Sequence, residues 1–116
     1  MSVSPKTVVL GAGAWGTALA LAQARAGRDV TLWSRSADAA SQINDQQGNE
    51  AYLPGIRFDA PLRVTANAAE ALGDASLVIA VIPAQSLREA LVTLAPHVPA
   101  KIPVILCAKG IEKNTG

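Results

Sequence analysis

Three glycines near the start of the chain have the spacing of a loop that can bind a phosphate group. They belong to the run GAGAWG at residues 11–16, which has the form G-x-G-x-x-G between an apolar run and an Ala-rich stretch. Gly11 allows a tight turn, Gly13 lets the backbone approach a pyrophosphate, and Gly16 allows close packing of helix on strand. The helix N-terminus then faces the anion with its free N–H groups. The run predicts a dinucleotide-binding turn, and the alternative is a glycine-rich turn without a ligand.

The residues that follow the second expected strand bear on which dinucleotide would bind. An Asp or Glu at this place accepts a hydrogen bond from the ribose 2′-hydroxyl of NAD. This chain has Ser34 and Arg35 instead. A guanidinium can pair with a 2′-phosphate in a fork and can also stack on adenine. We therefore expect NADP(H) to be preferred, with NAD(H) as the second candidate; the alternative for Arg35 is an ordinary solvated charge.

Four other side chains could take part in chemistry or could be structural. Trp15 could lie along a bound pyrophosphate and nicotinamide ribose, or it could pack in the core. Lys109 follows the last expected strand at the carboxyl edge of the sheet, where it could hold a phosphate or be a solvated loop lysine. We expect His97 on the surface and Cys107 as inert packing at the end of a buried strand. No metal site is predicted.

A parallel sheet is needed to position these residues, and the alternation of β-branched runs with Ala-rich stretches predicts one. Strands are expected over residues 7–10, 29–34, 62–65, 77–82 and 103–107. Helices are expected over 15–26, from the Ser36 cap to before Gly48, from the Asn67 cap to Gly73, and over 86–94. Residues 49–61 are interpreted as a surface loop. The fold class is α/β, a Rossmann-type doubly wound parallel sheet in three αβα layers.

Composition excludes several classes of protein. The 116 residues are half hydrophobic, and ten Lys and Arg against nine Asp and Glu give a net charge of +1 with no basic stripe, so nucleic acid is not an expected partner. The single cysteine cannot form an internal disulfide, which fits a reducing compartment. The longest apolar stretch has about half of the roughly 20 residues that a membrane span needs. A secretory signal peptide is the alternative for the opening, but its glycines would break the apolar helix.

Several segments in combination are more specific than the glycine run alone. They are GAGAWGTALA at 11–20, LWSR at 32–35, YLPG at 52–55, KGIE at 109–112 and TG at 115–116. Together they resemble the N-terminal part of bacterial NAD(P)-dependent glycerol-3-phosphate dehydrogenase, and the resemblance covers the whole chain. It implies that Ala14, Trp15 and Arg35 contact the cofactor, that Tyr52 approaches it, and that Lys109 touches both cofactor and substrate.

The resemblance also implies an activity, the interconversion of dihydroxyacetone phosphate and sn-glycerol 3-phosphate by hydride transfer to or from the NAD(P) cofactor. Residues 1–116 would form the cofactor-binding domain, truncated before a helical second domain, and the proton-transferring lysine would lie beyond Gly116. We therefore expect no catalytic residue in this chain and no activity from it alone. The whole enzyme would be a cytoplasmic homodimer that serves glycerophospholipid synthesis. One departure is Ala84, where many members have Ser after the proline.

Two other functions compete with this hypothesis. One is another NADP-dependent reductase of similar layout, such as ketopantoate reductase or a relative of 6-phosphogluconate dehydrogenase; the Tyr52 loop and the Lys109 ending argue against it. The other is a Rossmann module that senses a dinucleotide without turnover. Sequence beyond residue 116 would separate the three.

Overall fold

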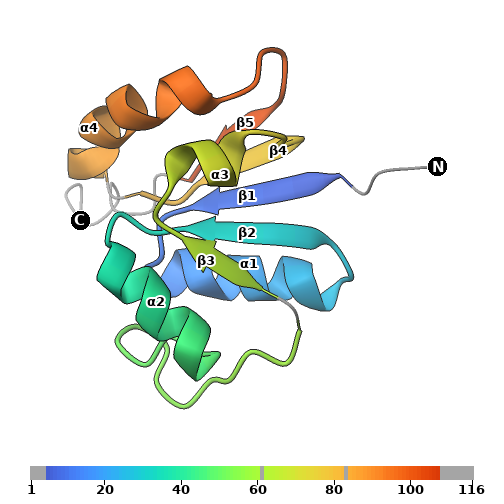
Figure 1. Ribbon diagram of the computed structural model, residues 1–116, viewed down its shortest axis with the longest axis vertical. Coiled ribbons are helices and arrows are strands. Elements are labelled where there is room, and N and C mark those ends of the chain that lie inside the picture. The colour runs from blue at the N-terminus through green and yellow to red at the C-terminus, as the bar shows by residue number, and fades with distance from the viewer. Residues whose placement is uncertain (1–4, 61, 83, 108–116) are drawn as a thin grey trace, which may run out of the picture.

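The computed structural model describes residues 5–60, 62–82 and 84–107, and these residues build a five-stranded parallel sheet with helices on both faces (Figure 1). The strands are β1 (Lys6–Leu10), β2 (Asp29–Trp33), β3 (Arg63–Thr65), β4 (Leu77–Ala80) and β5 (Val104–Leu106). Their order in the sheet is β3-β2-β1-β4-β5, and every neighbouring pair is parallel. The predicted Rossmann-type α/β fold is confirmed.

The helices begin and end at residues that the sequence marks. They are α1 (Ala14–Arg25), α2 (Ala37–Gln46), α3 (Ala68–Leu72) and α4 (Ala84–Leu94), with a short 3-10 helix at Ala95–His97. The Ser36 side chain caps α2 by accepting a hydrogen bond from the Ala39 N–H at 3.1 Å. The Asn67 side chain caps α3 in the same way, with the Glu70 N–H at 2.9 Å. The predicted caps are therefore confirmed.

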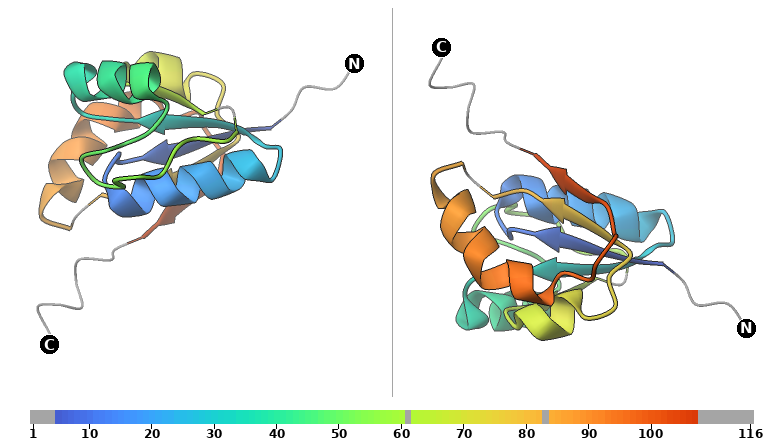
Figure 2. Two further views of the ribbon diagram at one scale, coloured as in Figure 1. Left: turned by 90° about the horizontal axis from the view of Figure 1, so that it is seen from below. Right: turned by 90° about the horizontal axis from the view of Figure 1, so that it is seen from above.

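The core consists of two clusters that β1 separates, because successive side chains of a strand point to opposite faces of a sheet. Val8 and Leu10 belong to the cluster that also holds buried residues of α3 and α4. Val9 belongs to the cluster with buried residues of α1 and α2. Figure 2 shows α1 on the opposite side of the sheet from α3 and α4. β1 is therefore covered on both faces, as its apolar run predicts.

The edge strand β5 differs from the prediction of a buried strand. Val104, Ile105 and Leu106 are 44%, 49% and 55% exposed. Since consecutive residues face opposite sides of the sheet, neither face of β5 is well covered within the described part of the chain. The apolar sequence therefore predicts the strand correctly, but the prediction that this strand is buried is wrong.

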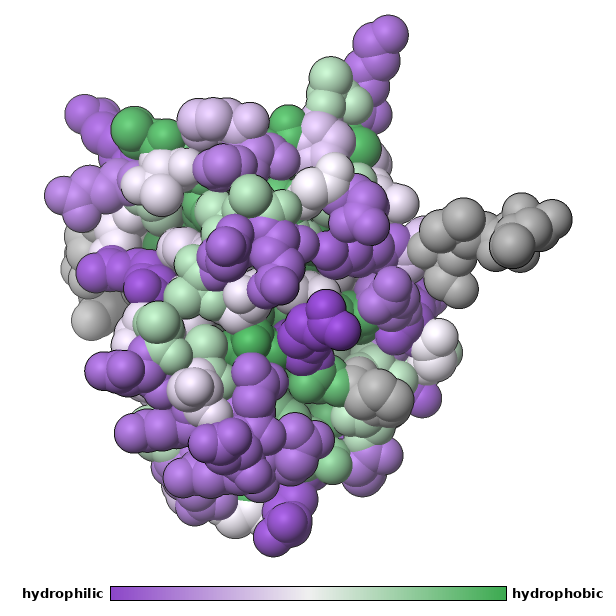
Figure 3. Space-filling model, viewed as in Figure 1, coloured by the Kyte–Doolittle hydropathy of each residue, from purple (hydrophilic) through white to green (hydrophobic). Residues whose placement is uncertain are grey.

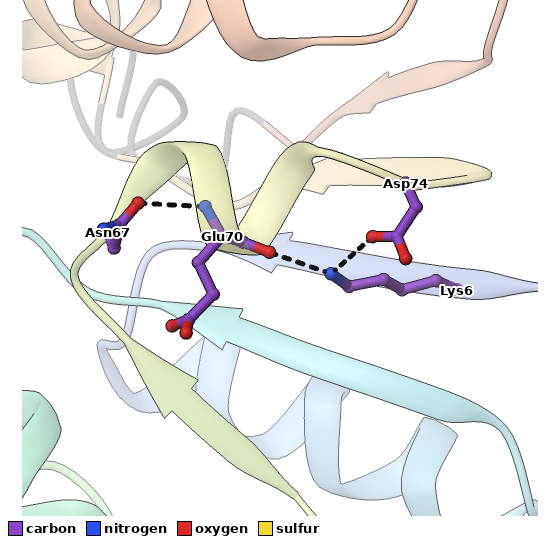
Figure 4. Close-up of polar contacts among 4 residues, drawn as sticks. All are labelled: Lys6, Asn67, Glu70 and Asp74. Carbon is purple, nitrogen blue, oxygen red and sulfur yellow. Dashed lines mark hydrogen bonds and ion pairs between the residues drawn. The ribbon is translucent and has the colours of Figure 1, made fainter.

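Among the described residues two ion pairs, Lys6–Asp74 and Arg25–Asp59, join distant segments at the surface. Lys6 Nζ lies 3.0 Å from Asp74 Oδ1 and also donates to the Glu70 carbonyl oxygen at 3.0 Å (Figure 4). These contacts hold the start of β1 against α3 and the turn that follows it. The hydrogen bond from Lys6 holds the pKa of the Asp74 carboxyl below its ordinary value.

The outer surface is mixed in character. In Figure 3 hydrophilic side chains cover much of the face that is seen, and hydrophobic ones appear in small patches between them. None of the helices in the described ranges combines the length and the apolar character that crossing a bilayer requires.

Candidate dinucleotide site

A cavity of about 660 Å³ lies at the carboxyl ends of the central strands. In the order of the strands, β2 and β3 lie on one side of β1, and β4 and β5 lie on its other side. Ligands of open α/β sheets bind where the strand order reverses in this way. The lining residues come from the glycine run and from segments that are distant in sequence: 11–16, 33–36, Ala39, Gln42, Ile43, Gln46, 49–52, Val81, Ile82, Ser86 and Cys107.

Gly11 and Gly16 are required by the protein itself. Gly11 has a φ of +112°, and a Cβ on it would stand 2.5 Å from the Val81 carbonyl oxygen. A Cβ on Gly16 would collide with the carbonyl oxygen of Gly11. The loop after β1 and the first turn of α1 are therefore in contact, with no room for a side chain between them. This close packing is what the motif predicts for these two glycines.

Gly13 differs from both. Its φ of −79° and ψ of −167° are extended values that any residue can adopt, and a Cβ on it would meet no atom within 4 Å. Gly13 lines the cavity and is the N-cap of α1, where no side chain caps the helix. The first N–H groups of a helix have no partner within the helix. An anion in the cavity could therefore reach this helix end without meeting a side chain.

Ser34 and Arg35 both line the cavity, but their surroundings differ. Ser34 is 5% exposed, and its Oγ accepts a hydrogen bond from the Ser36 N–H at 3.2 Å. Its hydroxyl thus serves the turn into α2. Arg35 is exposed, and among the described residues it takes part in neither ion pair. Its guanidinium is the group at this edge that can pair with an anion.

Two exposed aromatic side chains line the cavity, in addition to the buried Trp33. Trp15 is 54% exposed and Tyr52 is 59% exposed, and both line the cavity together with exposed Ala14. The alternative of Trp15 as a core residue is therefore wrong. Lys109 lies outside the described residues. The structure thus brings the predicted residues 11–16, 34, 35 and 52 to one site.

Two residues of the site were missed or misread from the sequence. Asn49 was included in a surface loop, yet it is 3% exposed and its Nδ2 donates to the Ala12 carbonyl oxygen at 2.9 Å. Nothing in its polar sequence neighbourhood marks it, because its partners lie more than thirty residues away. Cys107 is half-buried and packs against a core cluster, as expected of a packing residue, but it also lines the cavity, and the strand before it is not buried. His97 is exposed, as predicted.

The charged residues among the described lining are Arg35 and Glu50, and Glu50 Oε2 accepts a hydrogen bond from the Gly55 N–H in its own loop at 3.3 Å. Within the described ranges no three His, Cys, Asp or Glu side chains are grouped so that they could hold a metal ion. An open helix N-terminus, a guanidinium and two aromatic rings suit the binding of an elongated anionic ligand with flat rings.

Comparison with known proteins gives the same direction. Residues 6–116 match the family described as "NAD-dependent glycerol-3-phosphate dehydrogenase N-terminus". The glycerol-3-phosphate dehydrogenase [NAD(P)+] of Chelativorans sp. is 51% identical over 108 residues, which are 93% of this chain and 33% of that protein. The enzyme of the same name from Rhodospirillum rubrum is 49% identical over 108 residues, which are 93% of this chain and 31% of that protein.

A solved structure is also similar. The crystal structure of glycerol-3-phosphate dehydrogenase from Coxiella burnetii superposes with a TM-score of 0.83 at 32% identity, over 92% of this chain and 34% of that one. The chain spans about a third of the length of the curated relatives that it matches. With the family match over nearly all of its residues, the chain belongs to the NAD-dependent glycerol-3-phosphate dehydrogenase family, whose N-terminal part it matches.

Proposed function

We propose that residues 1–116 are the cofactor-binding domain of a glycerol-3-phosphate dehydrogenase and that this domain binds NADP(H) in preference to NAD(H). The observation that carries the binding of a dinucleotide is Gly13, and the exposed Arg35 at the cavity supports the preference for NADP(H). Neither its backbone angles nor its packing require a glycine, and it borders the cavity at the open end of α1. A ligand whose pyrophosphate approaches the backbone there explains the missing side chain.

The residues of the cavity have distinct tasks in this proposal. The α1 N-terminus holds the pyrophosphate through its N–H groups and the partial positive charge of the helix. Arg35 pairs with a 2′-phosphate, and Trp15 and Tyr52 flank the cofactor with apolar rings. When bound, the dinucleotide supplies the hydride chemistry. This chain's own residues bind and orient it.

The cofactor preference can be tested by titration calorimetry of NADPH and NADH. We expect NADPH to bind more tightly by about 1–3 kcal/mol, because Arg35 forms a charge-assisted pair with the extra phosphate. Arg35→Ala should bring the two affinities together. Arg28→Ala is the matched control, since exposed Arg28 lies outside the cavity lining. Equal affinities in the unchanged chain contradict the preference, and no binding of either cofactor contradicts dinucleotide binding itself.

The whole enzyme would interconvert dihydroxyacetone phosphate and sn-glycerol 3-phosphate by hydride transfer, with NAD(P)H as the donor in reduction and NAD(P)+ as the acceptor in oxidation. We infer this activity from the names of the relatives. That the whole enzyme is a cytoplasmic homodimer that supplies glycerophospholipid synthesis stays a prediction from the family resemblance. Lys109 as a contact to cofactor and substrate stays a prediction. Assays of the full-length protein with dihydroxyacetone phosphate and with ketopantoate decide between the proposed activity and the rival reductase, and turnover of neither favours a dinucleotide sensor.

A further inference from the structure

The side chain of Asn49 joins two segments that are far apart in the sequence. Its Nδ2 donates one hydrogen bond to the Ala12 carbonyl oxygen at 2.9 Å and another to Thr17 Oγ1 at 2.8 Å. Ala12 lies within the glycine run, and Thr17 is fully buried in the first turns of α1. Both hydrogens of one amide thus hold the turn and the helix at the cavity.

The bond to Ala12 fixes more than a carbonyl group. All peptide bonds of the described chain are trans, and in a trans peptide the C=O and the next N–H point in opposite directions. Holding the Ala12 carbonyl oxygen therefore also fixes the direction of the Gly13 N–H. Glycine permits backbone angles that other residues avoid, so a peptide beside Gly13 is easier to rotate. A rotated carbonyl would present negative charge to an anion at the helix end.

The backbone of Asn49 holds a second wall of the cavity. Its carbonyl oxygen accepts hydrogen bonds from the Tyr52 N–H at 3.2 Å and from the Leu53 N–H at 2.6 Å. These bonds form the turn that carries Tyr52. Tyr52 is distant from the glycine run in sequence, but both line the same cavity. One residue therefore links the phosphate-binding turn with the aromatic segment.

We propose that Asn49 is a positioning residue for the dinucleotide. It keeps the Ala12 carbonyl oxygen occupied, so that this oxygen cannot rotate toward the pyrophosphate, and it keeps the Tyr52 segment at the same cavity. The site is thereby formed before the ligand arrives, which saves the free energy of ordering it on binding. This proposal rests on the proposed function, because it assigns a role within that site.

Asn44 offers a matched control. It is also an asparagine with two hydrogen bonds to another segment: its Nδ2 donates to the Val64 carbonyl oxygen at 2.7 Å, and its Oδ1 accepts from the Val64 N–H at 3.1 Å. These bonds join α2 to β3, and Asn44 is not among the residues that line the dinucleotide cavity. Asn44→Ala thus removes a similar link without touching the site.

The test measures the Kd of NADPH and the thermal midpoint for the unchanged chain, Asn49→Ala and Asn44→Ala, at a temperature where each is folded. We expect both variants to melt at lower temperature, but only Asn49→Ala to raise the Kd, by about tenfold or more, or 1.4 kcal/mol. In ¹⁵N NMR spectra the Gly13 amide should shift in Asn49→Ala and not in Asn44→Ala. Asn49→Asp is the second variant if Asn49→Ala does not fold; its carboxylate cannot donate to the Ala12 oxygen, so the Kd should rise at least as much.

The outcomes separate the two proposals. If the unchanged chain does not bind NADPH, the proposed function fails and the role of Asn49 fails with it. If the unchanged chain binds and the Asn49 variants bind within about twofold of it, only the positioning role is overturned. Equal weakening in the Asn49 and Asn44 variants, in proportion to their loss of stability, also overturns it, because Asn49 would then be structural alone.

Discussion

The glycines of the run GAGAWG fit the same motif pattern but differ in whether the fold has room for a side chain at their positions. Gly16 has no room for a Cβ because the Gly11 carbonyl oxygen occupies the space, whereas a Cβ on Gly13 would stand free beside the cavity. The first is a condition for folding and the second is, in our proposal, a condition for binding. Substitutions can separate them.

We predict that Gly13→Val leaves the free energy of unfolding within about 1 kcal/mol of the unchanged chain, since only the cap preference changes. The Kd of NADPH should rise by about 100-fold or more, because a branched side chain stands where the pyrophosphate approaches. Gly16→Ala is the opposite case and should lose about 1–3 kcal/mol of stability through steric overlap. Thermal melts and calorimetric titrations of both variants supply the measurements.

The contrary result is equally clear. If Gly13→Val loses as much stability as Gly16→Ala, a glycine at position 13 is needed for folding, and the ligand is no longer required to explain it. If it folds and binds normally, the pyrophosphate does not approach that position.

How far single residues could be predicted depends on whether their partners are local. Gly16, the Ser36 cap and the Asn67 cap were predictable because each acts on residues within a few positions. Arg35 was predictable because it follows a strand at a place the fold defines. Asn49 was not, since its importance comes from Ala12 and Thr17, which only the folded chain brings to it.

Among the elements, β1 is held at its start by a charged contact that should respond to pH. The pKa of the Asp74 carboxyl is lowered from 3.8, first by its hydrogen bond with Lys6 and then by the positive charge of Lys6 (Figure 4). A lowered pKa in the folded state gives stability that is present above the unfolded pKa and is lost as the pH falls through the folded one.

We predict that Asp74→Asn lowers the thermal midpoint slightly at neutral pH and that the difference disappears as the pH falls below the ordinary carboxyl pKa of 3.8. The effect is small because Asp74 is exposed and Lys6 keeps its bond to the Glu70 carbonyl oxygen. Glu89→Gln, an exposed carboxylate of α4 outside both ion pairs of the described residues, is the control. A difference that persists at low pH would show that packing, and not the ion pair, is responsible.

The bounds of the strands and helices were predictable to within a few residues, because apolar β-branched runs and Ala-rich stretches alternate clearly. The burial of β5 was not, because an apolar run shows that a strand can be covered and not that something covers it. Its three residues are about half exposed at the edge of the sheet. Edge strands with apolar side chains and open backbone groups pair readily with other chains.

We predict that the 116-residue chain associates with itself through β5 at high concentration and that Ile105→Lys reduces this association. A charge on an edge strand opposes pairing with another edge. Val92→Lys is the control, since Val92 is 72% exposed but lies on α4. Sedimentation velocity over a concentration series is the measurement. Equal reduction by both variants would indicate a general effect of charge and contradict a role for the edge.

At the scale of the whole molecule, the cavity exists because β1 is the central strand and the sheet extends from it on both sides. Residues 11–16 and 81–82 follow β1 and β4, and residues 33–36 begin at the last residue of β2. They meet at one edge of the sheet, although they are far apart in sequence. The parallel sheet was predictable from the alternation of elements. The meeting of these particular segments follows from the strand order, which no single segment encodes.

The central place of β1 also affects the order of events during synthesis. β1 ends at Leu10, whereas β4, which pairs with it along one edge, begins at Leu77. At about 5–20 residues per second the ribosome needs roughly 3–13 s to make the intervening segment. β2 can pair with the other edge of β1 earlier, at residues 29–33. For those seconds the nascent chain carries an apolar strand, β1, with one edge unpaired. The β1–β2 part of the sheet keeps this open edge until β4 has been made.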